Sequence, residues 1–118
     1  MKLNELDKIV GERRINRRFH MRLPLLVRWA GQEGRTVESS AETQDVSSRG
    51  LYFYVDKQLS PGSAVEIVLT LPTEITLAGP VRVRCLGRII RVEPQNSTKK
   101  LGIAAEIDRY EFLRGEPA

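Results

Sequence analysis

The fold is decided by residues 81–92, Val81-Arg82-Val83-Arg84-Cys85-Leu86-Gly87-Arg88-Ile89-Ile90-Arg91-Val92, the longest strand pattern in the chain. Up to Cys85, apolar side chains alternate with arginines, which is the pattern of a strand with one buried face. Gly87 interrupts this alternation, as a glycine does at a bulge or a sharp bend. A long strand with such a bend favours a sheet that curves and closes on itself.

Five shorter stretches are also predicted to form strands, four with the same alternation of apolar and polar side chains and one, residues 35–46, that is mostly polar. They lie at about residues 23–29, 35–46, 50–55, 65–71 and 101–107. Turn signals separate them, among them Gly31-Gln32-Glu33-Gly34 and Ser60-Pro61-Gly62-Ser63. Six short strands with tight connections predict an all-β fold, a six-stranded antiparallel β-barrel, because closure satisfies every strand edge. Trp29 follows the inward face of its strand and is expected in the core.

The two ends of the chain are expected to differ from the barrel. Residues 1–21 are predicted to form a flexible basic N-terminal arm, and residues 22–118 the barrel domain. Residues 108–114 are predicted to form a short C-terminal helical turn. A length of 118 residues fits one such domain, large enough to bury a core without disulfide bonds.

The excess positive charge of the chain lies in its first third. Residues 1–36 contain nine Lys and Arg against four Asp and Glu, whereas residues 37–118 contain ten against eleven. A basic arm of this kind is often only solvated, or attracts nucleic acid or a membrane surface through charge alone. Seven of these nine cations are arginines, among them Arg13, Arg14, Arg17, Arg18, Arg22 and Arg28. Arginine is preferred where two-pronged hydrogen bonding matters, so the arm is expected to recognise a ligand.

Composition narrows the location and the class of protein. Cys85 is the single cysteine and cannot pair within the chain, and no stretch has the apolar length of a signal peptide or a membrane span, so we expect a cytoplasmic protein. With His20 as the single histidine, neither a histidine metal site nor a catalytic triad can be assembled. No paired acid and base and no phosphate-cradling glycine loop appears, so neither enzymatic activity nor a cofactor is predicted.

Two short motifs carry the functional information. One is Arg18-Phe19-His20-Met21-Arg22, and the other is Asp45-Val46-Ser47-Ser48-Arg49-Gly50. Arginine presents a fork of donors to a phosphate or to the O6/N7 edge of guanine, whereas a carboxylate accepts the N1 and N2 hydrogens of guanine. Together the motifs predict a site for a guanine nucleotide that carries phosphates. Taken alone, the second motif is more typical of a hydrogen-bonded turn.

Both motifs, in this order and with this strand pattern, resemble a PilZ domain. The resemblance covers about residues 12–108 and includes Glu12-Arg13-Arg14, Leu23-Pro24, Leu59-Ser60-Pro61-Gly62 and residues 101–107, Leu-Gly-Ile-Ala-Ala-Glu-Ile. PilZ domains are bacterial receptors for cyclic di-GMP. The resemblance therefore implies a cyclic di-GMP receptor or adaptor that acts on an unidentified partner protein in trans.

The resemblance also implies a role for each motif residue. Arg18 and Arg22 are expected to reach phosphate oxygens and the O6/N7 edge of guanine, and Asp45 and Ser47 another face of a guanine or its phosphate. Gly50 is expected to be a backbone requirement, either because a side chain would block the ligand or because the turn needs a positive φ.

The arginine spacing also fits the pairs Arg13/Arg17 and Arg14/Arg18. Arg18/Arg22 is preferred because the family places its second arginine directly before the first strand. Arg17 then stands just ahead of the motif, where an arginine is associated with two mutually intercalated cyclic di-GMP molecules, so a stacked pair is the preferred stoichiometry.

Two other functions remain open at this stage. The stronger alternative is a nucleic-acid-binding barrel, in which the basic arm contacts backbone phosphates and Tyr52 or Tyr54 stacks on bases. It predicts steep salt dependence and little preference for guanine. The other is an interaction module that has lost the nucleotide, although such members typically lack the motif residues present here.

Overall fold

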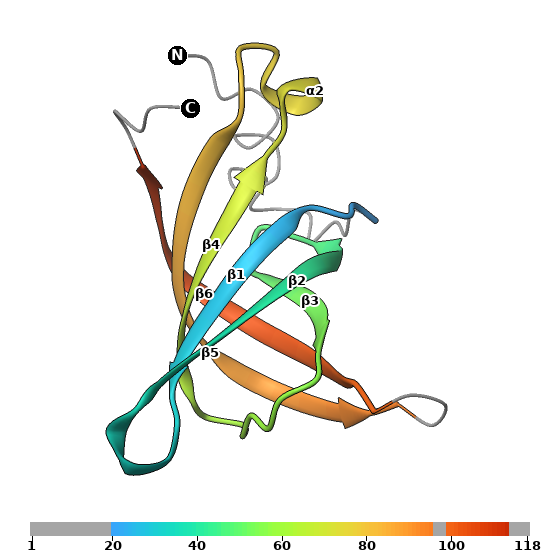
Figure 1. The fold of residues 1–118 in the computed structure, drawn as a ribbon. Helices are drawn as coiled ribbons and strands as arrows, with labels where there is room; N and C mark the ends of the chain where they lie inside the picture. The colour runs from blue at the N-terminus through green and yellow to red at the C-terminus, as the bar shows by residue number, and fades with distance from the viewer. Residues whose placement is uncertain (1–19, 96–98, 114–118) are drawn as a thin grey trace.

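The structure, a computed structural model, describes residues 20–95 and 99–113. Six strands form within these ranges: β1 (Pro24–Ala30), β2 (Thr36–Val46), β3 (Gly50–Val55), β4 (Ala64–Leu71), β5 (Val81–Pro94) and β6 (Leu101–Leu113). They close into a barrel in the order β1-β2-β3-β6-β5-β4, and every neighbouring pair is antiparallel (Figure 1). The predicted six-stranded antiparallel barrel is confirmed.

Side chains on the inward face of each strand fill the barrel and form its core. In β3, Leu51, Phe53 and Val55 are buried, whereas Tyr52 and Tyr54 between them are partly exposed. Trp29 is only 6% exposed and belongs to the core, as its position in the alternation predicts. The alternation thus fixes which side chains of β3 face outward, and Tyr52 is one of them.

Strand β5 bends where the sequence predicts it. Its pairing with β6 shifts register between Leu86 and Gly87, and shifts again between Ile89 and Arg91. A Cβ atom at Gly87 would lie 1.9 Å from the backbone oxygen of Glu106, so only glycine allows the two strands to approach this closely. The second shift lies in a run of apolar and basic residues that carries no glycine to signal it.

The prediction of a C-terminal helical turn at residues 108–114 is wrong over the part that the structure describes. Strand β6 continues to Leu113, which pairs with Arg82 of β5. Tyr110 and Phe112 pack against the core, so the alternation of the strand extends to its end. Long β5 supplies backbone partners for these residues, and this pairing overrides the weak helical signal of a short charged segment.

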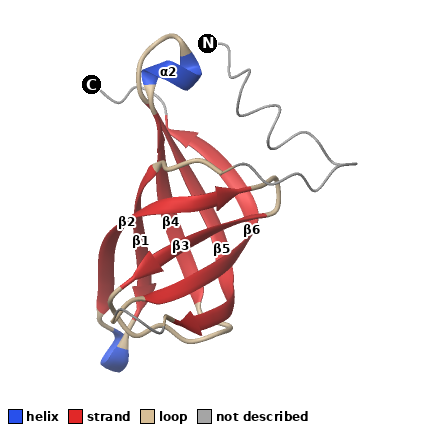
Figure 2. Cartoon of the chain, turned by 90° about the vertical axis from the view of Figure 1, so that its right-hand side faces the viewer, coloured by secondary structure: helices blue, strands red, loops and turns tan. Residues whose placement is uncertain are grey.

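Two short turns of helix lie at opposite ends of the barrel (Figure 2). The helix α2 (Thr73–Thr76) follows Pro72, which comes directly after β4, and a 3₁₀ turn at Gln32–Gly34 joins β1 to β2. The arm residues 1–19, with Arg17 and Arg18, lie outside the described residues, so the flexibility of the arm and its boundary at residue 22 stay predictions. Across the described ranges, helices are too short to cross a membrane.

Because the Cys85 side chain is buried, we expect it to lower the stability of the fold at alkaline pH. Its side chain is fully buried, and desolvation raises the pKa of the thiol from 9.0 to about 12. The unfolded chain ionises the thiol first, so its contribution to stability is complete below pH 9 and is lost as the pH rises toward 12. We expect the free energy of unfolding to fall with a slope of up to about 1.4 kcal/mol per pH unit from this group.

Urea titrations between pH 8 and 10 measure this slope. Tyr52 and Tyr110, whose pKa values are also raised on folding, add to it as the pH approaches 10, so the contribution of Cys85 is the difference from a variant without the thiol. The variant Cys85→Ala should show a flatter dependence on pH, whatever its absolute stability. Equal slopes for the two proteins would contradict the assignment to Cys85.

Candidate functional site

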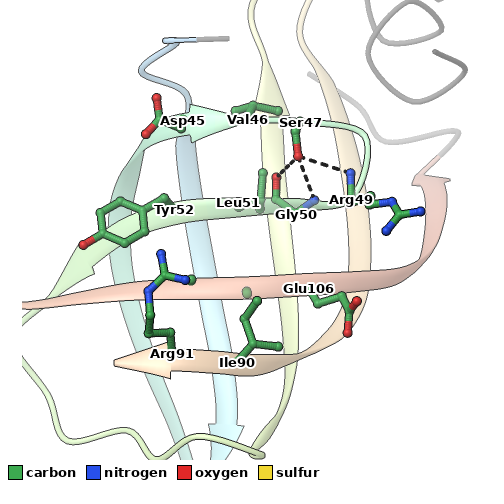
Figure 3. Close-up of a pocket in the computed structure, with 12 residues that line it drawn as sticks. Asp45, Val46, Ser47, Arg49, Gly50, Leu51, Tyr52, Ile90, Arg91 and Glu106 are labelled. Atoms are coloured by element: carbon green, nitrogen blue, oxygen red, sulfur yellow. Dashed lines mark hydrogen bonds between the residues drawn. The ribbon is translucent and has the colours of Figure 1, made fainter. Parts of the chain in front are cut away.

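The Asp45–Gly50 motif forms the tight connection between β2 and β3. The Ser47 hydroxyl accepts hydrogen bonds from the backbone N–H groups of Arg49 (3.3 Å) and Gly50 (3.2 Å) and donates one to the Gly50 carbonyl (3.4 Å) (Figure 3). The Ser47 N–H donates to the same carbonyl at 2.9 Å. These bonds use the donor and both acceptor sites of the hydroxyl, so Ser47 shapes the turn.

Gly50 is required by close packing between strands. A Cβ atom there would lie 2.2 Å from the backbone oxygen of Ala105 in β6. The glycines with a positive φ in the described part of the chain are Gly34, Gly62 and Gly79, so the expectation of a positive φ at Gly50 is wrong. The expectation of a backbone requirement stands, with the approach of β3 to β6 as its reason.

A pocket of about 230 Å³ opens beside this turn. Four strands contribute to it: the end of β2, the start of β3, the middle of β6 and the second register shift of β5 (Figure 3). The lining residues are Asp45, Val46, Ser47, Arg49, Gly50, Leu51, Tyr52, Ile90, Arg91, Ala104, Ala105 and Glu106. Three of the predicted site residues, Asp45, Ser47 and Gly50, therefore meet at one surface.

A hydrogen-bonded cluster stands at the β5 side of the pocket. The Tyr52 hydroxyl donates to Glu93 Oε1 at 2.7 Å, and Arg91 Nε donates to Glu93 Oε2 at 2.5 Å. Desolvation, and then the bond to Glu93, raise the pKa of Tyr52 to about 12. The same bond, followed by the bond from Arg91, lowers the pKa of Glu93. The cluster therefore holds a neutral phenol and a charged arginine beside the pocket near neutral pH.

The arm joins the barrel next to this pocket. Buried Thr43 of β2 accepts a hydrogen bond from the Leu23 N–H (2.8 Å) and donates one to the Met21 carbonyl (2.5 Å). Arg22 stands between these two anchored residues with an exposed side chain, and it does not line the pocket. Two residues before Arg22, His20 Nδ1 lies 2.5 Å from Asp45 Oδ1. The two motifs of the sequence are thus neighbours in space, while Arg17 and Arg18 lie outside the described residues.

The Thr43 hydroxyl offers a test of how the arm is anchored. Thr43→Val keeps the shape of the side chain but leaves the Leu23 N–H without its partner, so the free energy of unfolding should fall by about 1–3 kcal/mol. Thr43→Ser retains the hydroxyl and should lose clearly less. Chemical denaturation of the three proteins measures this, and equal losses in both variants would contradict a role for the hydroxyl.

Sequence reasoning missed the contributions of β5 and β6 to the pocket. Ile90, Arg91, Ala104 and Glu106 enter it because the second register shift of β5 turns that strand beside β6. The alternation of β6 does place Ala104 and Glu106 on the outward face, but it does not indicate what covers them. Within residues 20–95 and 99–113, no group of three or more His, Cys, Asp or Glu side chains is placed to hold a metal ion.

Comparisons with known proteins agree with this architecture. The family model of the PilZ domain matches residues 12–113. Among solved structures, the fold is similar to that of the Bacillus subtilis inhibitor of motility, MotI/DgrA, with a TM-score of 0.63 and 15% sequence identity. That match covers 83% of this chain and 43% of the other, so the chain spans less than half of that protein, and the likeness concerns the fold alone. No curated protein matches the chain.

Proposed function

The chain belongs to the PilZ domain family, a family of cyclic di-GMP receptors, and from this we propose that it binds cyclic di-GMP at the pocket beside the Asp45–Gly50 turn and signals to a partner protein in trans. The observation that carries the proposal is the meeting of both motifs at one rim of the barrel. Asp45, Ser47 and Gly50 line the pocket, and Thr43 anchors the chain on both sides of Arg22 next to it.

Each motif residue has a role in this proposal. Arg18 and Arg22 donate to phosphate oxygens and to the O6/N7 edge of a guanine, and Asp45 accepts from the N1 and N2 hydrogens of a guanine. Ser47 and Gly50 act by shaping the turn that presents Asp45. Arg17 extends the donor set to a second, intercalated nucleotide.

Signalling follows from the way the arm is attached. A ligand held by arm arginines and by Asp45 fixes the arm against the barrel, which changes the surface that the two form together. The protein is proposed to work in the bacterial cytoplasm as a non-enzymatic adaptor, because the chemistry assigned to these residues is recognition alone.

The nucleic-acid alternative gains no support from the described outer face of the barrel. Arg28 contacts Glu38 (2.5 Å) and Glu66 (3.7 Å), and Arg84 contacts Glu66 (2.6 Å) and Glu111 (3.0 Å). This alternation of sign across the strands is unlike the basic groove that tracks a nucleic-acid backbone.

Isothermal titration of the full chain with cyclic di-GMP, GTP and a random oligonucleotide separates the candidates. We expect binding of cyclic di-GMP with two nucleotides per chain, and much weaker binding of GTP and of the oligonucleotide. A ratio of one nucleotide per chain would reject the stacked pair but not the receptor. Absence of heat with cyclic di-GMP, or a preference for the oligonucleotide, would reject the receptor itself.

A further inference from the structure

Four residues of the pocket lie in one row across four strands. Asp45 of β2 pairs with Tyr52 of β3, Tyr52 with Ala104 of β6, and Ala104 with Arg91 of β5. All four line the pocket. With neighbouring strands about 4.8 Å apart, the backbones of the two end residues are separated by about 14 Å. An aspartate and an arginine therefore stand at the two ends of a row whose middle positions carry a phenol ring and a methyl group.

The guanidinium end of the row is held in place by the Tyr52–Glu93–Arg91 cluster. Each carboxylate oxygen of Glu93 has one partner, the Tyr52 hydroxyl at 2.7 Å and Arg91 Nε at 2.5 Å. In Figure 3 the Arg91 side chain reaches over β6 toward Tyr52. Its bond to Glu93 uses Nε, which leaves the edge formed by the two terminal nitrogens for another acceptor pair.

That free edge matches one side of one purine. Two parallel N–H groups of an arginine pair with O6 and N7 of guanine, whereas adenine presents a donor in place of O6. The neighbouring Tyr52 ring and Ala104 methyl group offer a flat apolar floor on which a base can lie. The negative charge of Glu93 favours a neutral base edge over a phosphate next to it, because like charges repel at short range.

We propose that Arg91 is a specificity-determining residue that reads the O6/N7 edge of a guanine lying over Tyr52 and Ala104, with Glu93 as its positioning residue. The proposal rests on the proposed function and extends it: the arm arginines contact the phosphates and one guanine of the bound cyclic di-GMP pair, and Arg91 contacts another guanine of that pair. Arg91 lies outside both sequence motifs, so the proposal assigns the preference for guanine to a residue of β5.

The test compares cyclic di-GMP with cyclic di-AMP, which has the same phosphates and different bases. The dissociation constants of both nucleotides are measured by competition for the unaltered chain, Arg91→Ala and Arg91→Lys. We expect the preference for cyclic di-GMP to fall by roughly 5- to 100-fold in Arg91→Ala. Arg91→Lys should lose a similar factor, because lysine keeps the charge and lacks the fork.

A matched control removes the same charge elsewhere. Arg35 is exposed, lies at the end of the barrel with the 3₁₀ turn and is outside the pocket lining, so Arg35→Ala should leave the preference unchanged. Equal weakening of both nucleotides by Arg91→Ala, or full preference in Arg91→Lys, would overturn the proposal in favour of a phosphate contact. A chain that binds neither nucleotide before substitution would overturn the proposed function, and this inference with it.

The positioning role of Glu93 is tested separately, by the ratio of the dissociation constants of the two nucleotides. Glu93→Ala releases Arg91 and should reduce the preference for cyclic di-GMP, and Glu93→Gln, which keeps a carbonyl acceptor, should restore part of it. A merely structural role would lower thermal stability without moving the ratio of the two dissociation constants. An unchanged ratio in Glu93→Ala would therefore overturn the positioning role.

Discussion

Substitution of Gly50 by alanine is expected to lower the free energy of unfolding by about 1–3 kcal/mol and to weaken cyclic di-GMP binding in the same protein. The added Cβ would meet the backbone oxygen of Ala105 at 2.2 Å, and a backbone atom inside a barrel cannot move aside as the end of a side chain can. Strand β3 must therefore shift away from β6, and this shift disturbs the turn that presents Asp45 to the pocket.

Gly87 provides the matched control for this prediction. It flanks β6 from the other side, where a Cβ would lie 1.9 Å from the backbone oxygen of Glu106, but it does not line the pocket. Gly87→Ala should destabilise the barrel at least as much and leave the affinity of the folded protein nearly unchanged. Thermal denaturation and titration below the unfolding range measure the two effects separately. If Gly50→Ala bound cyclic di-GMP as well as Gly87→Ala, the turn would not be part of the site.

The barrel could be predicted from the sequence because its signal is local. Alternation within each strand depends on residues two positions apart, and the bend of β5 depends on Gly87 itself. The end of β6 could not be predicted in the same way, since residues 108–113 adopt a strand only because β5 is long enough to pair with them. A partner some 30 residues away in the sequence leaves no mark on the local pattern.

The residues of the candidate site differ in the same way: some are brought together by local sequence spacing, and others by the pairing of distant strands. Asp45, Ser47 and Gly50 form one turn, so their proximity follows from their spacing. The position of Arg91 depends on how β5, β6 and β3 align, and that alignment includes a register shift between Ile89 and Arg91 without a glycine. A shift of one residue moves a side chain to the other face of a sheet, so the outward position of Arg91 could be found only from the structure.

Ser47 illustrates a different limit of sequence reasoning. The sequence allowed both a turn-forming hydroxyl and a ligand-binding one. In the structure its donor and acceptor sites are used within the turn, the longest bond being the one to the Gly50 carbonyl at 3.4 Å. A ligand contact by Ser47 would have to replace that bond, which is a condition that no sequence pattern expresses.

The largest effect on affinity is expected for Arg22. Arg22→Ala should weaken cyclic di-GMP binding by roughly ten- to a hundredfold, equivalent to about 1.5–3 kcal/mol for a hydrogen bond between charged groups. Arg22 is exposed, so its loss should leave the free energy of unfolding nearly unchanged. Arg22→Lys should bind only slightly better than the alanine variant, because the ammonium group lacks the two-pronged geometry. Isothermal titration of the three proteins measures these differences.

Arg28 is the matched control for Arg22, because it stands on β1, carries the same charge and contacts Glu38 and Glu66 outside the pocket lining. Arg28→Ala should change the affinity by less than about threefold, since exposed ion pairs contribute little. Equal losses in both variants would mean that total charge drives binding, as in the nucleic-acid alternative. Arg14→Ala extends the comparison to the competing Arg14/Arg18 pair: a loss larger than that of Arg22→Ala would make Arg14/Arg18 the binding pair, with Asp45 still the acceptor.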